Sequence, residues 1–378
     1  MTNIFAVPSS SPRLAAMEGL RAYAALIVYI LHLISRFANE RLNIDLDETS
    51  FLQLAATQVE YTALYWLWSS HYGVDIFFLL SGYLIAGMVN KVDFHYSRFL
   101  FHRFLRIYPT LVIMLFVYVL YGMVFGEGIF WLGGIIGNLL LLNGIPGFDF
   151  PGINQVTWSI FFEFSFYFSF PLIWCICKKK PGNLVIISTL IIIPLLLISP
   201  DYMRFLMFIA GVILKTLSDT KLCKIRSYFT ENQVFLLYIA STTIFVFTKN
   251  YMLFIPIYIL TATLLVDRAI NSQGWLARFF SLKALRYFGN ISFSFYLFHP
   301  LGLTISHEII ISANVQNNYA YFVLYFIFSL LISLALSILC FSFVEKQYFK
   351  NKNNIDAVFD NILNVKETIK NKLARKAC

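Results

Sequence analysis

Charged residues are scarce in this sequence. Lysine, arginine, aspartate and glutamate make up 13% of its 378 residues, whereas hydrophobic residues make up 59%. A soluble domain averages about 25% charged residues, so this composition excludes a single soluble core. Long apolar runs recur instead, each close to the ~20 residues that a helix needs to cross a bilayer. The alternating pattern of a transmembrane β-barrel is lacking, and we predict an all-α integral membrane protein.

A cysteine framework, a secretory leader and nucleic-acid motifs are lacking as well. The cysteines follow neither a disulfide nor a metal-site spacing, so we expect inert thiols and no metal: Cys175, Cys177, Cys223, Cys340 and Cys378. Glu18 and Arg21 interrupt the first apolar segment and no small-residue cleavage site follows, which indicates a retained helix. The net charge is +9, and the charged residues lie between the apolar segments. We therefore expect no nucleic-acid partner.

Ten apolar segments predict about ten transmembrane helices. They cover residues 18–37, 71–90, 108–126, 157–177, 183–199, 202–218, 233–248, 251–267, 289–310 and 320–344. A further stretch, 130–145, is short and rich in glycine. If it does not cross and the N-terminus is cytoplasmic, most of the 29 lysines and arginines lie on the cytoplasmic side, as the positive-inside rule requires. We therefore expect 130–145 to be a re-entrant or outer-surface segment, and both termini to be cytoplasmic.

These segments divide the chain into three expected parts. They are a cytoplasmic N-terminal tail (1–13), a transmembrane domain (14–349) and a cytoplasmic basic tail (350–378). Apolar residues recur at helical spacing in the last part: Ile355, Val358, Phe359, Ile362, Leu363 and Val365. This pattern favours an amphipathic helix on the inner leaflet, and a solvated tail is the alternative.

The first span carries two ionisable residues, which are costly inside a bilayer. Arg21 and His32 are 11 residues apart, which places them on nearly one face of a helix and about 16 Å apart along its axis. Glu163 falls at the same expected depth as His32, and a carboxylate can orient an imidazole and raise its basicity. The alternatives are an Arg21 that snorkels to the headgroups, a His32 that only packs, and a Glu163 that only accepts structural hydrogen bonds.

Other polar groups lie in later spans. His299 is expected near the middle of the membrane, where it precedes a helix-kinking Pro300. Asp75 lies one turn after His71 at the outer end of the second span. An interfacial position explains His71, whereas Asp75 lies deeper and is a stronger candidate for the site.

The inner end of the third span holds a basic cluster. Four side chains precede Pro109, which we expect to open the span: Arg98, His102, Arg103 and Arg106. Arg103 and Arg106 are neighbours on a helix, and guanidinium groups suit phosphates. A positive-inside anchor is the alternative. Together with acid–base groups in the outer half, these arginines suit a cytoplasmic donor with an anionic head and a long arm, such as acyl-coenzyme A, and an acceptor that arrives from outside.

Five stretches in this order resemble the acyltransferase 3 family of integral membrane acyltransferases, which includes O-antigen acetylases and exopolysaccharide-modifying proteins. They are "MEGLRAYAALIVYILH" (17–32), "GVDIFFLLSGYLI" (73–85), "RFLFHRFLRIYP" (98–109), "WSIFFEFSFYFSFP" (158–171) and "ISFSFYLFHP" (291–300). The resemblance spans roughly 14–349. The family pattern of an arginine, ten residues and a histidine falls on Arg21 and His32, its Arg-x-x-Arg on Arg103 and Arg106, and its glutamate after Trp-Ser on Glu163. This implies a role for His32 in acyl transfer and for Arg103 and Arg106 in handling acyl-CoA.

The sequence departs from the family pattern at several positions. Glu18 stands where the family often has aspartate, and Phe164 follows Glu163 where a second glutamate is frequent. Gln347 replaces a usual proline, so Glu345 is not assigned a catalytic role. The soluble hydrolase-like domain appended in some members is not in this sequence.

From these residues and the resemblance, we expect O-acyl transfer, with acetyl as the expected group, from acyl-CoA to a hydroxyl of a cell-surface or lipid-linked carbohydrate in a bacterial cytoplasmic (inner) membrane. His32 is the expected base, oriented by Glu163, and an acyl-histidine intermediate is the variant. Arg21, Arg103 and Arg106 are expected to hold the coenzyme phosphates, and His299 and Asp75 to line the site or bind the acceptor. A proton-coupled exporter of a saccharide is the alternative, and a non-catalytic scaffold is a third class. The acceptor, the acyl length and the oligomeric state stay open.

Overall fold

The computed structural model describes residues 12–44, 59–68, 72–125, 132–217, 219–248 and 251–357, together with 359 and 361. Within these ranges the chain is helical and contains no strand, as the composition predicts. The elements are α1 (Pro12–Arg36), η1 (Phe37–Arg41), α3 (Val59–Trp68), α4 (Gly73–Val89), α5 (Tyr96–Phe125), α6 (Leu132–Leu139), η2 (Leu142–Gly144), α7 (Trp158–Ile176), α8 (Pro181–Leu196), η3 (Pro200–Arg204), α9 (Phe205–Thr216), α10 (Asp219–Tyr228), α11 (Glu231–Thr248), α12 (Tyr251–Asn271), α13 (Trp275–Phe280), α14 (Lys283–Ser312), α15 (Asn318–Cys340) and η4 (Phe341–Glu345).

Each predicted span has a helical counterpart, but the count of ten spans is not confirmed. Six stretches in the described residues are long and apolar enough to cross a membrane: Leu14–Arg41, Thr62–Val89, Tyr96–Phe125, Trp158–Ile176, Leu253–Asn271 and Asn318–Ala357. The spans predicted at 183–199, 202–218, 233–248 and 289–310 correspond to α8, α9, α11 and α14, which are shorter or less apolar. The integral membrane class therefore stands on six helices, and the orientation of the termini stays a prediction.

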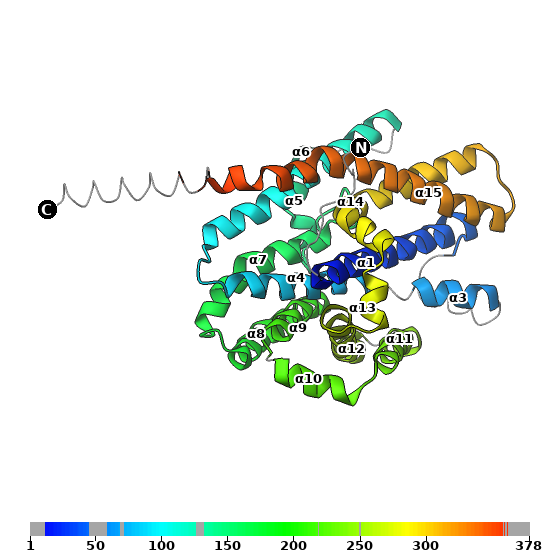
Figure 1. Cartoon of the computed structure of the whole chain (residues 1–378). Coiled ribbons are helices and arrows are strands. Elements are labelled where there is room, and N and C mark those ends of the chain that lie inside the picture. The colour runs from blue at the N-terminus through cyan, green and yellow to red at the C-terminus, as the bar shows by residue number, and fades with distance from the viewer. Residues whose placement is uncertain are drawn as a thin grey trace, which may run out of the picture.

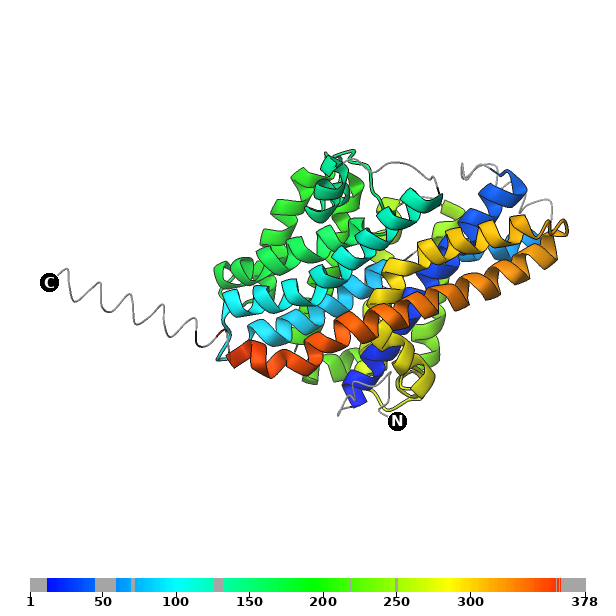
Figure 2. The same ribbon diagram turned by 90° about the horizontal axis from the view of Figure 1, so that it is seen from above.

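Helix α1 lies near the middle of the molecule, with α14 and α15 on one side and α11 to α13 on the other (Figure 1). It packs directly against α14, α4, α12 and α13, and the long helices run in similar directions when seen from above (Figure 2). Glycines allow the closest approaches. A Cβ at Gly289 of α14 would lie 1.9 Å from the carbonyl oxygen of Glu18, and one at Gly73 of α4 would lie 2.3 Å from that of Ala24. Small residues at such crossings let helix backbones meet in a membrane.

Helix α5 corrects the predicted start of the third span. We expected Pro109 to open a span at 108–126, but α5 begins at Tyr96 and Pro109 lies inside it. Neighbouring helices can compensate for the hydrogen bond that a proline removes from a transmembrane helix. The basic cluster before Pro109 is therefore part of one continuous 30-residue helix.

The chain before α7 folds into the protein. Helix α6 has eight residues, about 12 Å at 1.5 Å per residue, which is too short to cross a bilayer. Asn154, Val156 and Thr157 are buried, and the Asn154 amide donates a 2.8 Å hydrogen bond to the carbonyl of Leu297 on α14. Helix α7 therefore begins inside the molecule, well below the surface at which the sequence pattern placed it.

The C-terminal helix continues past the expected end of the membrane domain. The π-helical turn η4 leads into a helix that runs to Ala357. His102 on α5 fastens this extension, with hydrogen bonds to Tyr348 (3.1 Å) and Asp356 (2.8 Å). Most of the predicted amphipathic tail, from residue 362 onward, lies outside the described residues, as does His71.

Candidate active site

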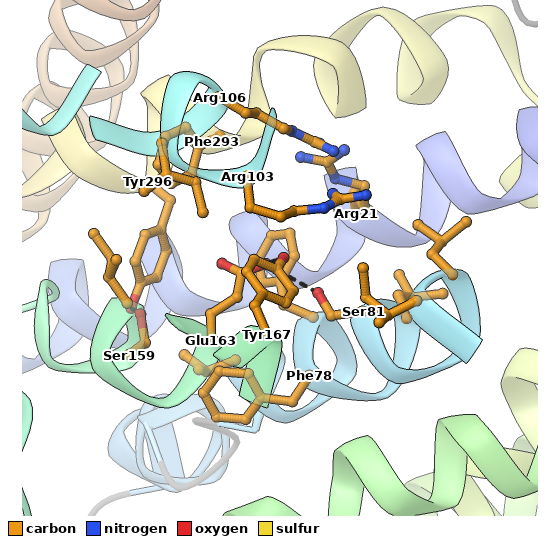
Figure 3. Close-up of a pocket in the computed structure, with 17 residues that line it drawn as sticks. Arg21, Phe78, Ser81, Arg103, Arg106, Ser159, Glu163, Tyr167, Phe293 and Tyr296 are labelled. Carbon is orange, nitrogen blue, oxygen red and sulfur yellow. Dashed lines mark hydrogen bonds between the residues drawn. The ribbon is translucent and has the colours of Figure 1, made fainter. Parts of the chain in front are cut away.

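Three arginines from two helices converge on one pocket. Arg21 of α1 and both Arg103 and Arg106 of α5 line a cavity of about 70 Å³ together with residues of α4, α7 and α14. Figure 3 shows their guanidinium groups gathered on one side, facing Glu163, Tyr167 and Ser81. Arg103 and Arg106 lie on one helix face because they are three residues apart. We call this group of six residues the arginine pocket.

Glu163 is the carboxylate inside the arginine pocket. It accepts a 3.0 Å hydrogen bond from Ser81 and another from Tyr167. A second carboxylate, Glu345 of η4, is buried, accepts a hydrogen bond from Ser294, and lies close enough to interact electrostatically with Arg21 and Arg106. Three guanidinium groups therefore face two carboxylates, which leaves one excess positive charge.

Arg103 is buried with an unused hydrogen-bond donor. Its guanidinium lies over the rings of Phe99 and Tyr167, each at 5.3 Å, and one terminal nitrogen contacts the sulfur of Met88 at 2.7 Å. Its Nε is buried and has no hydrogen-bond partner among the described residues. A buried donor without an acceptor is costly, and the three guanidinium groups that line the pocket are donors of the kind that phosphate oxygens accept from. The residues present thus fit the phosphate groups of a coenzyme.

A pair of histidines lies further along α1. His32 Nδ1 and His299 Nε2 are 2.9 Å apart, and we call these two residues the histidine pair. His299 Nδ1 faces the carbonyl of Phe295 at 3.2 Å. Because a carbonyl only accepts, His299 carries its proton on Nδ1, and in the neutral pair His32 donates from Nδ1 to His299 Nε2. This hydrogen-bond network leaves His32 Nε2 unprotonated, as a general base requires.

The predicted contact between Glu163 and His32 is wrong. The partner of His32 is His299, whereas Glu163 bonds to Ser81 and Tyr167 in the arginine pocket. The prediction placed the start of α7 at the outer boundary of the membrane. Because the segment before α7 is buried, Glu163 lies deeper than expected, at the level of Arg21.

Asp75 belongs to neither group. It is fully buried and accepts hydrogen bonds of 2.9 and 3.0 Å from Arg204. The Arg204 guanidinium also lies 4.9 Å from the ring centre of Trp158, the first residue of α7. Asp75 is absent from the pocket lining. The structure thus places it in a buried ion pair that joins three helix ends, and not at the site that we expected it to line.

Tyr296 lies between the two groups. It lines the arginine pocket, and its ring lies 6.0 Å from that of His299, one turn further along α14. Its hydroxyl is 2.9 Å from both Ser159 Oγ and the carbonyl oxygen of Val156. Tyr296 therefore contacts both the arginine pocket and His299.

The sequence analysis did not identify several of these residues. Tyr167 was detectable, because it follows Glu163 by four residues and so lies on the same helix face. Ser81, Tyr296 and Arg204 carried no local signal, since their roles arise from contacts between helices far apart in sequence. Glu345 stood out in the sequence, and only the fold brings it to the arginines.

The comparisons with known proteins agree on one family. Residues 14–338 match the sequence profile described as an acyltransferase domain. Acyltransferase MdmB of Streptomyces mycarofaciens is 28% identical over 183 residues, which cover 46% of this chain and 43% of that protein. The putative peptidoglycan O-acetyltransferase YrhL of Bacillus subtilis is 23% identical, with 87% of this chain and 54% of that protein covered. Peptidoglycan O-acetyltransferase OatA of Listeria monocytogenes is 23% identical, with 65% and 47% covered.

The chain thus spans about half the length of the curated relatives it matches. No solved structure matches it.

Proposed function

The chain belongs to the family of the acyltransferase domain, and from that premise we propose that it transfers an acyl group, with acetyl as the expected one, from acyl-CoA to a carbohydrate hydroxyl. The observation that carries this proposal is the placement of two groups along α1. The arginine pocket offers charge for an anionic donor, and the histidine pair offers a base for a hydroxyl. The family match does not favour the alternative of a saccharide exporter.

The arginine pocket is the proposed binding site for the coenzyme phosphates. Guanidinium groups form paired, charge-assisted hydrogen bonds with phosphate oxygens. Arg103 supplies a buried donor without a partner among the described residues, and the excess positive charge favours an anion. In this role the charges of Glu163 and Glu345 attract the arginines and offset their mutual repulsion before the donor binds.

His32 is the proposed general base, and His299 is its positioning residue. The acceptor hydroxyl loses its proton to His32 Nε2 as its oxygen attacks the thioester carbonyl. The new acyl–oxygen bond forms, the acyl–sulfur bond breaks, and the proton passes to the departing thiolate. His299 Nε2 holds the Nδ1 proton of His32 throughout, which stabilises the imidazolium that forms. An acyl-histidine intermediate on His32 is the covalent variant.

The thioester must travel between the two groups. Arg21 and His32 are separated by about 16 Å along α1, which a long flexible coenzyme arm can span. Tyr296 lines the arginine pocket and lies beside His299, so its contact with Ser159 is the one that we expect to open as the thioester moves toward His32. A site closed to water protects the thioester from hydrolysis.

We further propose that the acceptor is a cell-surface or lipid-linked carbohydrate and that the protein acts in a bacterial cytoplasmic membrane. Two relatives carry peptidoglycan O-acetyltransferase in their names, which supports a sugar hydroxyl as the acceptor. With low identity and half of each relative covered, the particular carbohydrate is not transferred to this chain.

Label transfer in proteoliposomes tests this function. The purified chain is reconstituted with acetyl-CoA that carries the label in its acetyl group and, in parallel reactions, with peptidoglycan fragments, an O-antigen-type oligosaccharide or a lipid-linked sugar. We expect a labelled ester on one acceptor that hydroxylamine removes. Hydrolysis of acetyl-CoA without an ester on any acceptor class, or proton-driven saccharide movement without label transfer, would contradict the proposal.

A further inference from the structure

A second, larger cavity lies on the opposite side of α1 from the arginine pocket. It measures about 470 Å³ and is lined by α1, α3, α11, α12 and α13. Helix α1 contributes Tyr23, Ile27 and Ile30, which follow one another at helical spacing on one face. The lining is almost entirely apolar and includes no charged side chain.

The cavity exists because α11 packs against α12 and stands away from α1. The hydroxyl groups of Tyr23 on α1 and Tyr238 on α11 meet at 3.1 Å at its floor. The two ends of α11 are held by tryptophans: Trp66 of α3 donates to Thr243 (3.0 Å), and Trp275 of α13 donates to Asn232 (2.8 Å). These hydrogen bonds join α11 to α3 and to α13, and so fix the positions of three walls of the cavity.

The dimensions fit one lipid chain. Asn232 and Thr243 are 11 residues apart, so about 16 Å of α11 separates the two tryptophan contacts. One leaflet has a hydrocarbon depth of about 15 Å, half of the ~30 Å core. The cavity opens where Phe235 (38% exposed) and Phe279 (45% exposed) reach the surface.

Hydrocarbon is the occupant that this cavity requires. The hydroxyl and indole groups of the lining already bond to other groups of the protein, so water finds few hydrogen-bond partners in this cavity. Because the cavity opens to the apolar surface at Phe235 and Phe279, a hydrocarbon chain from the bilayer can enter it. We propose that the cavity holds one acyl chain of an anionic membrane phospholipid, drawn from the leaflet next to α13.

The charge beside the opening selects an anionic headgroup. Arg278 is exposed and precedes the lining residue Phe279 on α13, and the exposed Lys283 begins α14 five residues later. A phosphate-bearing headgroup next to this short helix lies within reach of both cations, which raise the local concentration of anionic lipid. The bound acyl chain packs against the face of α1 that lies opposite Arg21 and His32.

Native mass spectrometry of the purified full-length chain tests the site. The protein is stripped of lipid in detergent and incubated with phosphatidylglycerol or with phosphatidylcholine of the same palmitoyl-oleoyl chains. We expect one retained phosphatidylglycerol. The double substitution Ile27→Trp with Ile239→Trp fills the cavity, and should weaken this binding by about tenfold or more, which is at least ~1.4 kcal/mol. Leu260→Trp on the bilayer-facing side of α12 is the matched control and should bind as the parent does.

Two further sets of substitutions complete the test, one that fills the cavity less and one that removes the charges next to its opening. If the double variant unfolds, Ile239→Phe alone should still lower lipid retention while its elution volume and thermal unfolding match the parent. Arg278→Ala with Lys283→Ala should reduce phosphatidylglycerol binding to the level of phosphatidylcholine. Unchanged retention in a folded, filled variant overturns the proposal, as does equal binding of the two lipids by the parent. None of these outcomes bears on acyl transfer.

Discussion

The arginine pocket and the histidine pair share helix α1 but differ in construction. The pocket gathers charged groups from several helices around a cavity. The histidine pair is one direct contact between α1 and α14, and no carboxylate among the described residues bonds to it. In the proposed mechanism the arginine pocket binds the anionic donor and the histidine pair handles the proton. The two proposed roles are separated by about 16 Å of one helix, so substitutions can test them independently.

The largest effect is expected at the histidine pair. Replacing His32 with alanine removes the base, and general base catalysis contributes about 10²- to 10⁴-fold, so kcat should fall by that factor. The KM for acetyl-CoA should change little, because the arginine pocket is untouched. Steady-state acetyl transfer in proteoliposomes measures both constants. His307→Ala is the matched control, since His307 contacts Glu40 and Tyr321 at the far end of α14 and should turn over normally. Normal kcat in His32→Ala would remove His32 from the mechanism.

In the arginine pocket we expect the opposite pattern, in which KM for acetyl-CoA changes and kcat changes little. Arg103→Ala removes charge-assisted hydrogen bonds to the donor, each worth about 1.5–3 kcal/mol, and should raise the KM for acetyl-CoA by about 10- to 100-fold. Arg103→Lys should recover only part of this loss, because an ammonium group lacks the planar pair of donors. Arg98→Ala on the same helix is the control, as Arg98 faces the ring of Phe359. A fall in kcat with an unchanged KM would assign Arg103 to the chemical step.

The same contrast shows what the sequence could predict. Helical periodicity alone places Arg21 and His32 on one stripe and Arg103 beside Arg106, because these relations lie within single helices. The convergence of these arginines and the pairing of His32 depend on how helices pack. The depth of Glu163 was misjudged because hydropathy treats residues before a span as surface, whereas Asn154 and Val156 are buried against other helices.

For the same reason, the positions of charged residues in the sequence predicted the site only in part. Asp75 and Arg204 each look like an isolated charge in the sequence, one in a span and one beside it, and only the fold shows them as a buried pair. The helical class followed from composition, since a bilayer forces backbone groups to bond internally. The number of membrane-spanning helices did not follow from composition, because several helices are too short or too polar for hydropathy to classify.

A smaller effect is expected from His299, which acts through His32. His299→Ala removes the acceptor for the His32 Nδ1 proton, and the loss of one such hydrogen bond should lower kcat by about tenfold. His299→Gln offers an amide oxygen near the position of Nε2 and should restore most of the activity. The KM for acetyl-CoA should stay unchanged in both variants. Equal losses in the alanine and glutamine variants would indicate that His299 only fills space.

The smallest catalytic effect is expected at Asp75, although the cost in stability is high. Asp75→Asn removes the carboxylate that faces the buried Arg204 at 2.9 Å, and breaking a buried pair in this way costs about 3–5 kcal/mol. The variant should unfold at a lower temperature and accumulate less in membranes. The molecules that fold should keep kcat and KM within about twofold, a difference of well under 1 kcal/mol, because Asp75 touches neither the arginine pocket nor the histidine pair. Thermal unfolding in detergent and activity per folded molecule separate the two quantities. A large rise in the KM for the acceptor at unchanged stability would show that Asp75 contributes to the active site. Its ion pair with Arg204 would then belong to the same functional unit as the arginine pocket and the histidine pair.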